Sequence, residues 1–256
     1  MRNVVDLNSD VGESFGAYKL GLDEEVLKHV SSVNIACGWH AGDPMVMEKT
    51  VLLAKANKLG IGAHPGYPDL LGFGRRNMDI TPKEARAYLI YQLGALNAFT
   101  EAAGCQLQHV KLHGAYYNMV SSNMALAKEV AKAIFDVNKN IIVLALAGSE
   151  LVKAAQEIGL KVAEEVFADR AYNSDGTLAS RKLPGSVIHD KKLAIERVKR
   201  MVCEGKVTAM DGKDIKINAD SICVHGDNPE AVAFVASIRE QLEADGIKIK
   251  PISEFI

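Results

Sequence analysis

The sequence contains no run of about 20 apolar residues, which is the length that a membrane-spanning helix needs. It also shows no apolar signal-peptide core, because the opening MRNVVDLNSD enters a strand-like pattern at once. Four cysteines occur in 256 residues, and none has CxxC spacing. A disulfide framework and a zinc knuckle are therefore not expected. These absences predict a cytoplasmic protein with reduced thiols and no contact with a membrane.

A strong charge of either sign is also missing. The formal net charge is −2, which argues against a general nucleic-acid-binding surface. No low-complexity tract, fixed-period repeat or linker interrupts the chain. With 48% hydrophobic and 24% charged residues, residues 1–256 are expected to form a single domain.

Several catalytic motifs are absent as well. The sequence has no GxxxxGK[ST] phosphate loop, no GxGxxG after the first expected strand, no GxSxG nucleophile elbow and no HExxH zinc motif. The serines have no obvious activating base. General acid–base chemistry by imidazoles and carboxylates, or metal-assisted hydrolysis, therefore remains.

Short apolar runs alternate with longer segments of helical period. This alternation predicts parallel strands joined by helical crossovers. The expected strands are NVVDLN, SSVNIA, IGAH, HVKLH, IIVLAL, KVAEEVFA and SICVHG. Asp43-Pro44, Thr81-Pro82 and Asn228-Pro229 each pair an N-cap side chain with a proline suited to the first helical position.

Two segments depart from the alternation. Asp211-Gly212 lies between two strand-like runs, so a small β-hairpin is expected near 206–218, before the last strand. The segment 169–185 is long, polar and without periodicity. Such loops in compact domains are often functional, and we expect this one to be so.

Polar residues follow nearly every expected strand. Because the carboxyl ends of parallel barrel strands meet at one rim, where active sites are built, these residues are expected to lie together. They are Asp6, Asn8, Asp10, His40, His64, His113, Asp169, Arg170 and His225.

Structural roles remain open for many of them. Asp and Asn side chains form turns and helix caps, and a histidine before a helix often serves as a structural hydrogen-bonding group. Asp169 and Arg170 can form a simple salt bridge, and Tyr116 can pack as a core or lid residue. Closely placed carboxylates can equally bind a divalent metal or act as acid and base.

Cationic side chains accompany these groups. Arg75 lies in the glycine-rich loop after His64 and can make bidentate contacts with a carboxylate or phosphate. Lys111 and His113 are two residues apart and are expected to point inward together. A lysine inside a barrel needs an acidic partner or an anionic ligand.

Six segments resemble, in order, the blocks typical of the LamB/YcsF family. They are DLNSDVGESFG, IACGWHAGDP, AHPGYPDLLGFGRR, VKLHGAYYN, EVFADRAY and CVHGDNP. The resemblance extends from Asp6 to Pro229. The departures bear on the shape of the pocket more than on the type of reaction; they are Ser9 for cysteine, Trp39 for phenylalanine, Leu112 for proline and Tyr116 for leucine.

The resemblance implies an irregular seven-stranded (β/α) barrel of the glycoside hydrolase/deacetylase type. It also implies the A subunit of an ATP-dependent 5-oxoprolinase, which converts 5-oxo-L-proline to L-glutamate together with partner subunits B and C. ATP is then a cofactor shared with the partners, although the sequence does not decide whether this chain contacts it. A bound metal and a homo-oligomer remain open.

Roles in that reaction are assigned from the positions of the residues at and after the strand ends. The catalytic candidates are His113, His64, Asp10, Asp6 and His40, and the metal-ligand candidates are Asp10, His40 and His64. The substrate-binding candidates are Lys111, Arg75, Asn8, Tyr116, Asp169, Arg170 and His225. Two rival functions are a metal-dependent carbohydrate deacetylase-like hydrolase and a non-enzymatic subunit that binds and presents a small molecule.

Overall fold

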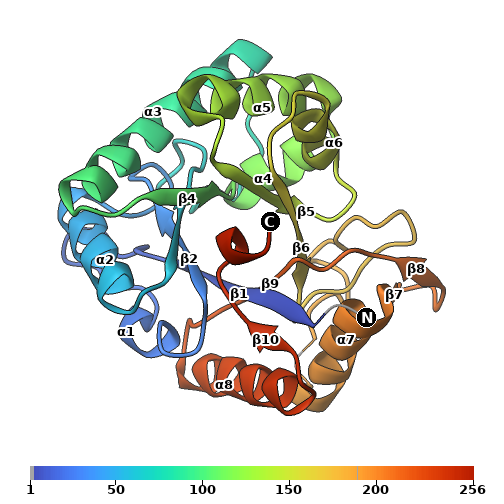
Figure 1. Cartoon of the computed structure of the whole chain (residues 1–256). Coiled ribbons are helices and arrows are strands. Elements are labelled where there is room, and N and C mark those ends of the chain that lie inside the picture. Colours follow the sequence, from blue (N-terminus) through green and yellow to red (C-terminus); the bar gives the residue numbers. More distant parts are fainter. Residues whose placement is uncertain (1–2, 189) are drawn as a thin grey trace.

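The computed structural model describes residues 3–188 and 190–256, and within them parallel strands close into a barrel surrounded by helices (Figure 1). The barrel strands are β1 Val4–Val11, β2 Ser32–Ala36, β3 Gly60–His64, β4 Leu107–Val110, β5 Ile142–Leu146, β6 Val162–Phe167 and β9 Ser221–Val224. Each pairs with the next in this order, and β9 pairs with β1 to close the ring. Among the described residues the ring therefore has seven strands, which confirms the predicted fold class.

Helices follow most of the strands, as expected for right-handed crossovers. They are α1 Asp23–Val26, α2 Pro44–Ala56, α3 Pro82–Ala102, α4 Gly114–Ser121, α5 Met124–Asn138, α6 Glu150–Glu157, α7 Lys191–Glu204 and α8 Pro229–Ala244. None of the described helices is long and apolar enough to cross a membrane.

The predicted helix starts are confirmed. The Asp43 side chain accepts hydrogen bonds from two backbone amides of α2, and Asn228 caps α8 in a similar way. Thr81 and Glu84 form a reciprocal capping box at the start of α3. Each cap fixes the point at which the chain leaves a loop at the barrel rim and enters a helix.

The interior of the barrel is polar. On β1, Val5 and Leu7 belong to the apolar core, whereas the alternate residues Asp6 and Asn8 are buried inside the ring. Asn8 bonds across the ring to Glu165 of β6, so polar groups replace the branched apolar layers that usually fill such barrels.

Small residues make room for these polar groups. A Cβ on Gly62 would lie 2.1 Å from Nε2 of His109, so only glycine at this point of β3 allows the imidazole to lie inside the ring. The same nitrogen lies 2.7 Å from Oδ1 of Asn34 on β2. Burial, followed by the charge of Lys111, lowers the pKa of His109 to about 3, so the ring is neutral and donates this bond.

The predicted hairpin is confirmed as β7 Lys206–Thr208 paired antiparallel with β8 Asp214–Lys216. Gly212 in its turn has φ +83°, a conformation that glycine adopts readily. The segment 169–185 has only isolated bridges, such as Tyr172 with Leu178. It covers one side of the rim, in agreement with the expected long loop.

The amino ends of the strands are covered by the last residues of the chain. Strand β10, Lys248–Ile249, pairs with β1, and the short helix η1, Ile252–Glu254, follows it. Figure 1 shows this turn over the centre of the ring. Ile252 is fully buried in a small apolar cluster with Ile142 and Leu144, so this end of the barrel is closed.

Candidate active site

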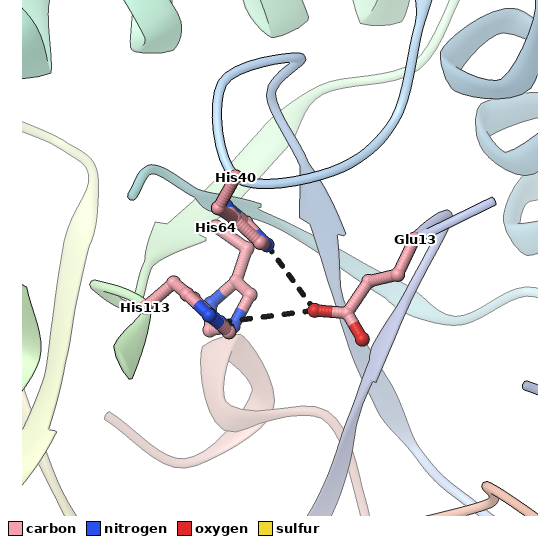
Figure 2. A group of neighbouring side chains, drawn as sticks. All are labelled: Glu13, His40, His64 and His113. Carbon is pink, nitrogen blue, oxygen red and sulfur yellow. Dashed lines mark hydrogen bonds and ion pairs between the residues drawn. The ribbon is translucent and has the colours of Figure 1, made fainter. Parts of the chain in front are cut away.

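A cluster of histidines and carboxylates occupies the opposite end, where the strands terminate at their carboxyl ends. His64 is the last residue of β3, and His113 is the N-cap of α4 directly after β4. His40 lies in the turn between β2 and α2, and Glu13 lies two residues after β1. Figure 2 shows the three imidazoles and the Glu13 carboxylate pointing toward one another.

Lys111 lies below this cluster, 2% exposed, with four polar groups around its ammonium nitrogen. Its Nζ is 2.8 Å from Glu165 Oε1, 3.0 Å from Asp10 Oδ1 and 3.1 Å from both Asn8 Oδ1 and Cys223 Sγ. Burial acts to lower the pKa of Lys111, but the Asp10 carboxylate and the Cys223 sulfur raise it well above its usual value. The lysine is therefore a fixed positive charge.

Asp10 links the lysine to the histidines. Its second oxygen, Oδ2, lies 3.3 Å from His64 Nε2. Burial raises the pKa of Asp10, but the neighbouring His64 and Lys111 outweigh burial and hold it well below its usual value. Asp10 is therefore a carboxylate at neutral pH, as required of a partner for an imidazole.

Backbone carbonyls hold two of the imidazoles from outside. His64 Nδ1 lies 2.8 Å from the Lys111 carbonyl oxygen, and His113 Nε2 lies 2.8 Å from that of Phe73. The inner nitrogens, His64 Nε2 and His113 Nδ1, are 3.0 Å apart. The loop after β3 and the end of β4 thus fix both rings relative to each other.

His40 packs flat on His113, with ring centroids 3.7 Å apart. Burial, followed by the nearby His64, lowers the pKa of His40 well below its usual value, so its ring is neutral. Its Nε2 lies 3.2 Å from Glu13 Oε1, and His113 Nδ1 lies 3.7 Å from the same oxygen. Burial and the nearby Asp10 carboxylate raise the pKa of Glu13.

A second pair lies across the rim. His225 Nδ1 is 3.4 Å from Asp169 Oδ2, and His225 Nε2 is 3.9 Å from Cys223 Sγ. Burial acts to lower the pKa of His225, but the Cys223 sulfur and Asp169 raise it well above its usual value. Burial raises the pKa of the Cys223 thiol, although Lys111 and His225 act to lower it. The Asp169 carboxylate is the partner of His225 in the ion pair.

A cavity of about 190 Å³ opens among these groups. Its polar lining residues include Asp10, His64, Arg75, Lys111, His113, Tyr117, Arg170, Arg181 and His225. A neighbouring hollow of about 330 Å³ shares Arg75, Arg181 and His225. A larger hollow, about 940 Å³, lies at the other end of the barrel near Gln108 and Ser253, and the residues that line it include no histidine. The chemistry therefore identifies the smaller cavity as the site.

The structure brings most of the predicted site residues together. His40, His64 and His113 are in mutual contact. Asp10, Asn8 and Lys111 form the layer below them, and Arg75, Arg170, Asp169 and His225 surround the two rim cavities.

Asp6 lies deeper in the barrel. Its carboxylate accepts hydrogen bonds from the hydroxyls of Ser31 at 2.6 Å, Ser32 at 2.7 Å, and Ser221. Burial raises the pKa of Asp6 to about 6 even though these hydroxyls act to lower it. Of the two predicted catalytic aspartates, Asp10 and not Asp6 is therefore the one in contact with a histidine.

Tyr116 does not face the cavity, which corrects its predicted role in substrate binding. Its hydroxyl donates to the Ala85 carbonyl oxygen at 2.6 Å, and its ring stacks on Tyr67 between α3 and the rim loop. Tyr117 instead lines the cavity and donates to Glu165 Oε2 at 2.8 Å. The change from strand to helix at Gly114 turns successive side chains by about 100°, so neighbouring tyrosines face different surroundings.

Several residues of the site had no role assigned from sequence. Glu165 lies within the strand-like run KVAEEVFA next to Glu164, and either of the two adjacent acids could lie on the exposed face of the strand. Its position two residues before Phe167, whose ring lies 5.6 Å from Lys111 Nζ, is the signal that could have placed it inside the barrel. Asn34 and Cys223 carried no comparable signal.

Comparison with known proteins finds a family model, related sequences and related structures that match this chain. The family model described as LamB/YcsF family matches residues 5–256. A protein of Fusobacterium nucleatum subsp. nucleatum, named as the A subunit of 5-oxoprolinase, is 60% identical over 256 residues, which cover 100% of both chains. The crystal structure of a lactam utilization protein from Thermus thermophilus has a TM-score of 0.91 and 44% identity, covering 96% of this chain and 99% of that one.

A more distant structure shares the fold alone. The catalytic domain of a peptidoglycan N-acetylglucosamine deacetylase from Eubacterium rectale has a TM-score of 0.51 at 12% identity, covering 98% of this chain and 89% of that one. The expected likeness to deacetylase-type barrels is thus confirmed at the level of fold.

Proposed function

Because the chain belongs to the LamB/YcsF family, we propose that it is the A subunit of an ATP-dependent 5-oxoprolinase, a hydrolase that opens the lactam ring of 5-oxo-L-proline to give L-glutamate. The observation that carries this proposal is the 60% identity, over the full length of both chains, to a protein named as the A subunit of 5-oxoprolinase. The chain would act in the cytoplasm with partner subunits B and C, which is consistent with its free cysteines.

The cavity can hold the carboxylate of such a substrate. Arg75 and Arg181 lie on its walls, and His225 is held in its charged form by Asp169. Guanidinium groups bind carboxylates through paired hydrogen bonds. A volume of about 190 Å³ suits a small cyclic amino acid better than a sugar chain.

Ring opening requires water to add to the lactam carbonyl carbon, the C–N bond to break, and the departing nitrogen to gain a proton. His64 and His113 lie on the cavity wall and can activate that water, either as bases or through an ion. Lys111 is the fixed positive charge beside them, and it can stabilise negative charge that develops on the carbonyl oxygen.

The role of ATP follows from the low reactivity of an amide. Phosphorylation of the lactam oxygen by the partner subunits would transfer the γ-phosphoryl group of ATP, release ADP and make the ring carbon more electrophilic. Addition of water here and cleavage of the C–N bond, with a proton gained by the departing nitrogen, would give an acyl phosphate. Its hydrolysis by a second water would release phosphate and yield L-glutamate. The missing GxxxxGK[ST] motif is consistent with an ATP site on a partner.

The test is release of L-glutamate from 5-oxo-L-proline by the chain together with co-expressed partner subunits. Release that requires both ATP and this chain supports the proposal. His113→Ala should then lower turnover by roughly 10²–10⁴-fold. If the partner subunits are folded and no glutamate is released, the proposed function is contradicted. If a folded complex with His113→Ala has unchanged turnover, the role of His113 is contradicted.

The histidine cluster also favours one second candidate, a metal-dependent deacetylase-like hydrolase. Such an enzyme would release acetate from an acetylated sugar without ATP and without partner subunits. The same preparations therefore distinguish the two functions when acetylated sugars replace 5-oxo-L-proline.

A further inference from the structure

The hydrogen-bond partners of His64 determine which of its nitrogens carries the proton. A carbonyl oxygen accepts but never donates, so the nitrogen that faces it must carry the hydrogen. His64 Nδ1 faces the Lys111 carbonyl oxygen at 2.8 Å, which leaves Nε2 of the neutral ring with a bare lone pair. The same reasoning holds for His113, where Nε2 faces the Phe73 carbonyl oxygen at 2.8 Å and Nδ1 is left bare.

These two bare nitrogens face each other at 3.0 Å. Neither can donate to the other, and both also lie near carboxylate oxygens. Asp10 Oδ2 is 3.3 Å from His64 Nε2, and Glu13 Oε1 is 3.7 Å from His113 Nδ1. With the neutral rings in these tautomers no hydrogen lies between the two nitrogens, so their lone pairs repel each other unless a cation lies between them.

The cation could be an extra proton or a metal ion. A proton on either bare nitrogen would turn a neutral ring into a buried imidazolium. His64 is 1% exposed and His113 is 4% exposed, so a charge on either ring would be buried away from water. One proton would also lie between two nitrogens only, whereas a metal ion can contact Glu13 and His40 as well.

We propose that Glu13, His40, His64 and His113 bind a divalent transition-metal ion through Glu13 Oε1, His40 Nε2, His64 Nε2 and His113 Nδ1. One ligand atom from each of these four residues lies within 4.8 Å of all the others. Metal–ligand bonds of about 2.0–2.1 Å in a tetrahedron place neighbouring ligand atoms roughly 3.3 Å apart. The three separations described above, 3.0, 3.2 and 3.7 Å, scatter around that value.

The surroundings of His64 and His113 are those of metal ligands. Histidines that bind metals usually donate their outer N–H to a carbonyl or carboxylate, which fixes the ring and its tautomer. Both His64 and His113 do so with backbone carbonyls. A set of imidazoles with one carboxylate suits zinc, cobalt or nickel rather than magnesium or calcium.

A second group of candidate ligands, Asp10, Cys223 and His225, also has atoms within 4.8 Å of one another. Here the cation is already present as the side chain of Lys111, whose Nζ is 3.0 Å from Asp10 and 3.1 Å from Cys223. The ammonium group and a metal ion would repel each other there. One ion per chain, at the histidine cluster, is therefore expected.

The test is metal binding by the isolated full chain, with any polyhistidine tag removed. The protein is stripped with a chelator and titrated with Co²⁺ and with Zn²⁺, and bound metal is measured by elemental analysis after gel filtration. We expect one ion per chain, a visible absorption band with Co²⁺ and a higher melting temperature in the presence of Zn²⁺.

Three variants locate the ion. His113→Ala and His64→Ala should weaken metal binding by about 100-fold or more, since even outer-shell changes cost 10–100-fold. Glu13→Gln has nearly the same size and should also weaken binding, while circular dichroism verifies that each variant is folded. His29→Ala and His225→Ala are the matched controls and should bind as the unmodified chain does.

A stripped chain that takes up no Co²⁺ or Zn²⁺ overturns the proposal. So does unchanged binding in folded Glu13→Gln and His113→Ala, or loss of binding in His225→Ala alone. Because the readout is bound metal and not glutamate release, its failure is distinct from failure of the proposed function.

Discussion

Lys111 and the acids around it show how single residues determine the stability of the barrel centre. Its ammonium group contacts Asp10 and Glu165, and both Lys111 and Glu165 have almost no exposed side-chain surface. A buried pair is costly to form, but removing one partner leaves an uncompensated charge. The lysine is therefore required by its neighbours, whatever its role toward a ligand.

Replacing Lys111 with methionine should lower the free energy of unfolding by about 3–5 kcal/mol, because Asp10 and Glu165 would then be buried without their cation. Urea denaturation of the isolated chain measures this change. Lys111→Met combined with Glu165→Gln should recover part of the loss. A loss in the double variant equal to the sum of the losses of Lys111→Met and Glu165→Gln alone would show that the two side chains are not coupled.

Asp6 makes a second contribution to the stability of the folded chain, and this contribution depends on pH. Its pKa in the folded chain is about 6, against 3.8 for an ordinary aspartate. Between these values the folded state binds more protons than the unfolded state, so stability falls as pH rises through this window. The difference corresponds to about 3 kcal/mol, at about 1.36 kcal/mol per pKa unit.

Asp6→Asn should therefore gain stability relative to the unmodified chain when the pH is raised from about 4 to about 7. Urea denaturation at several pH values gives the difference between the two proteins. Asp79→Asn, which changes an exposed aspartate, controls for the loss of one charge. Parallel stability profiles for the Asp6→Asn protein and the unmodified chain would contradict the raised pKa.

Among single side chains, those near the expected strand ends could be identified from sequence, whereas Glu165 within β6 could not. His40, His64 and His113 are followed by glycine-containing turns or helix starts, which are local features. Glu165 is buried only because the ring closes and places it opposite Lys111. Contacts across a barrel depend on the register of distant strands, and one sequence does not specify that register.

Helix caps are the part of each element that the sequence predicts best, since the groups involved lie within four residues of one another. At the start of α3, the Thr81 hydroxyl accepts from the Glu84 backbone amide at 3.2 Å, and Glu84 Oε2 accepts from the Thr81 amide at 2.8 Å. Helix α3 in turn carries Gln92, which bonds the backbone of Gly66 in the rim loop.

Thr81→Ala should lower the free energy of unfolding by about 1 kcal/mol, because the Glu84 amide in the first turn of α3 loses its hydroxyl partner. The midpoint of urea denaturation should shift while the slope of the transition stays constant. Lys83→Ala, a change at an exposed residue of the same turn, is the control. An equal shift in both variants would argue against a capping effect.

Elements without such local signals were not predicted. The sequence indicated neither α4 nor α7 as a separate helix, and β10 is a strand of two residues, too short for a periodic pattern. Strand β10 exists because Lys248 and Ile249 lie beside Val4 and Val5 once the ring is closed. The hairpin, by contrast, was predicted from Asp211-Gly212 because its turn is local.

The two ends of the complete barrel have different tasks. The carboxyl ends of the strands carry the histidines, and the amino ends are covered by the turn around η1. Alternation of strands and helices made the parallel arrangement predictable from sequence, and polar strand ends predicted which end would carry the site. The cover at the other end depends on a few apolar residues without periodicity.

Ile252→Ala tests that cover. Removing a fully buried isoleucine from contact with Ile142 and Leu144 should cost about 2–4 kcal/mol and lower the melting temperature by about 5–10 °C. Ser253→Ala, which removes a bond to Gln108 at 2.8 Å, should have a smaller effect. Because the change lies at the far end from the histidines, loss of metal binding in a folded Ile252→Ala protein would contradict this separation.

The polar interior of the barrel also determines how this chain can evolve. In a barrel with an apolar centre, interior side chains can be exchanged for others of similar volume while the rim stays unchanged. Here Asn8 bonds to Ser221 and Glu165 on one side and to Lys111 on the other, and Asn34 bonds to Asp10. A mutant library with substitutions in the barrel interior therefore also changes the end that carries the histidines. Variants that remain folded should carry paired substitutions on neighbouring strands.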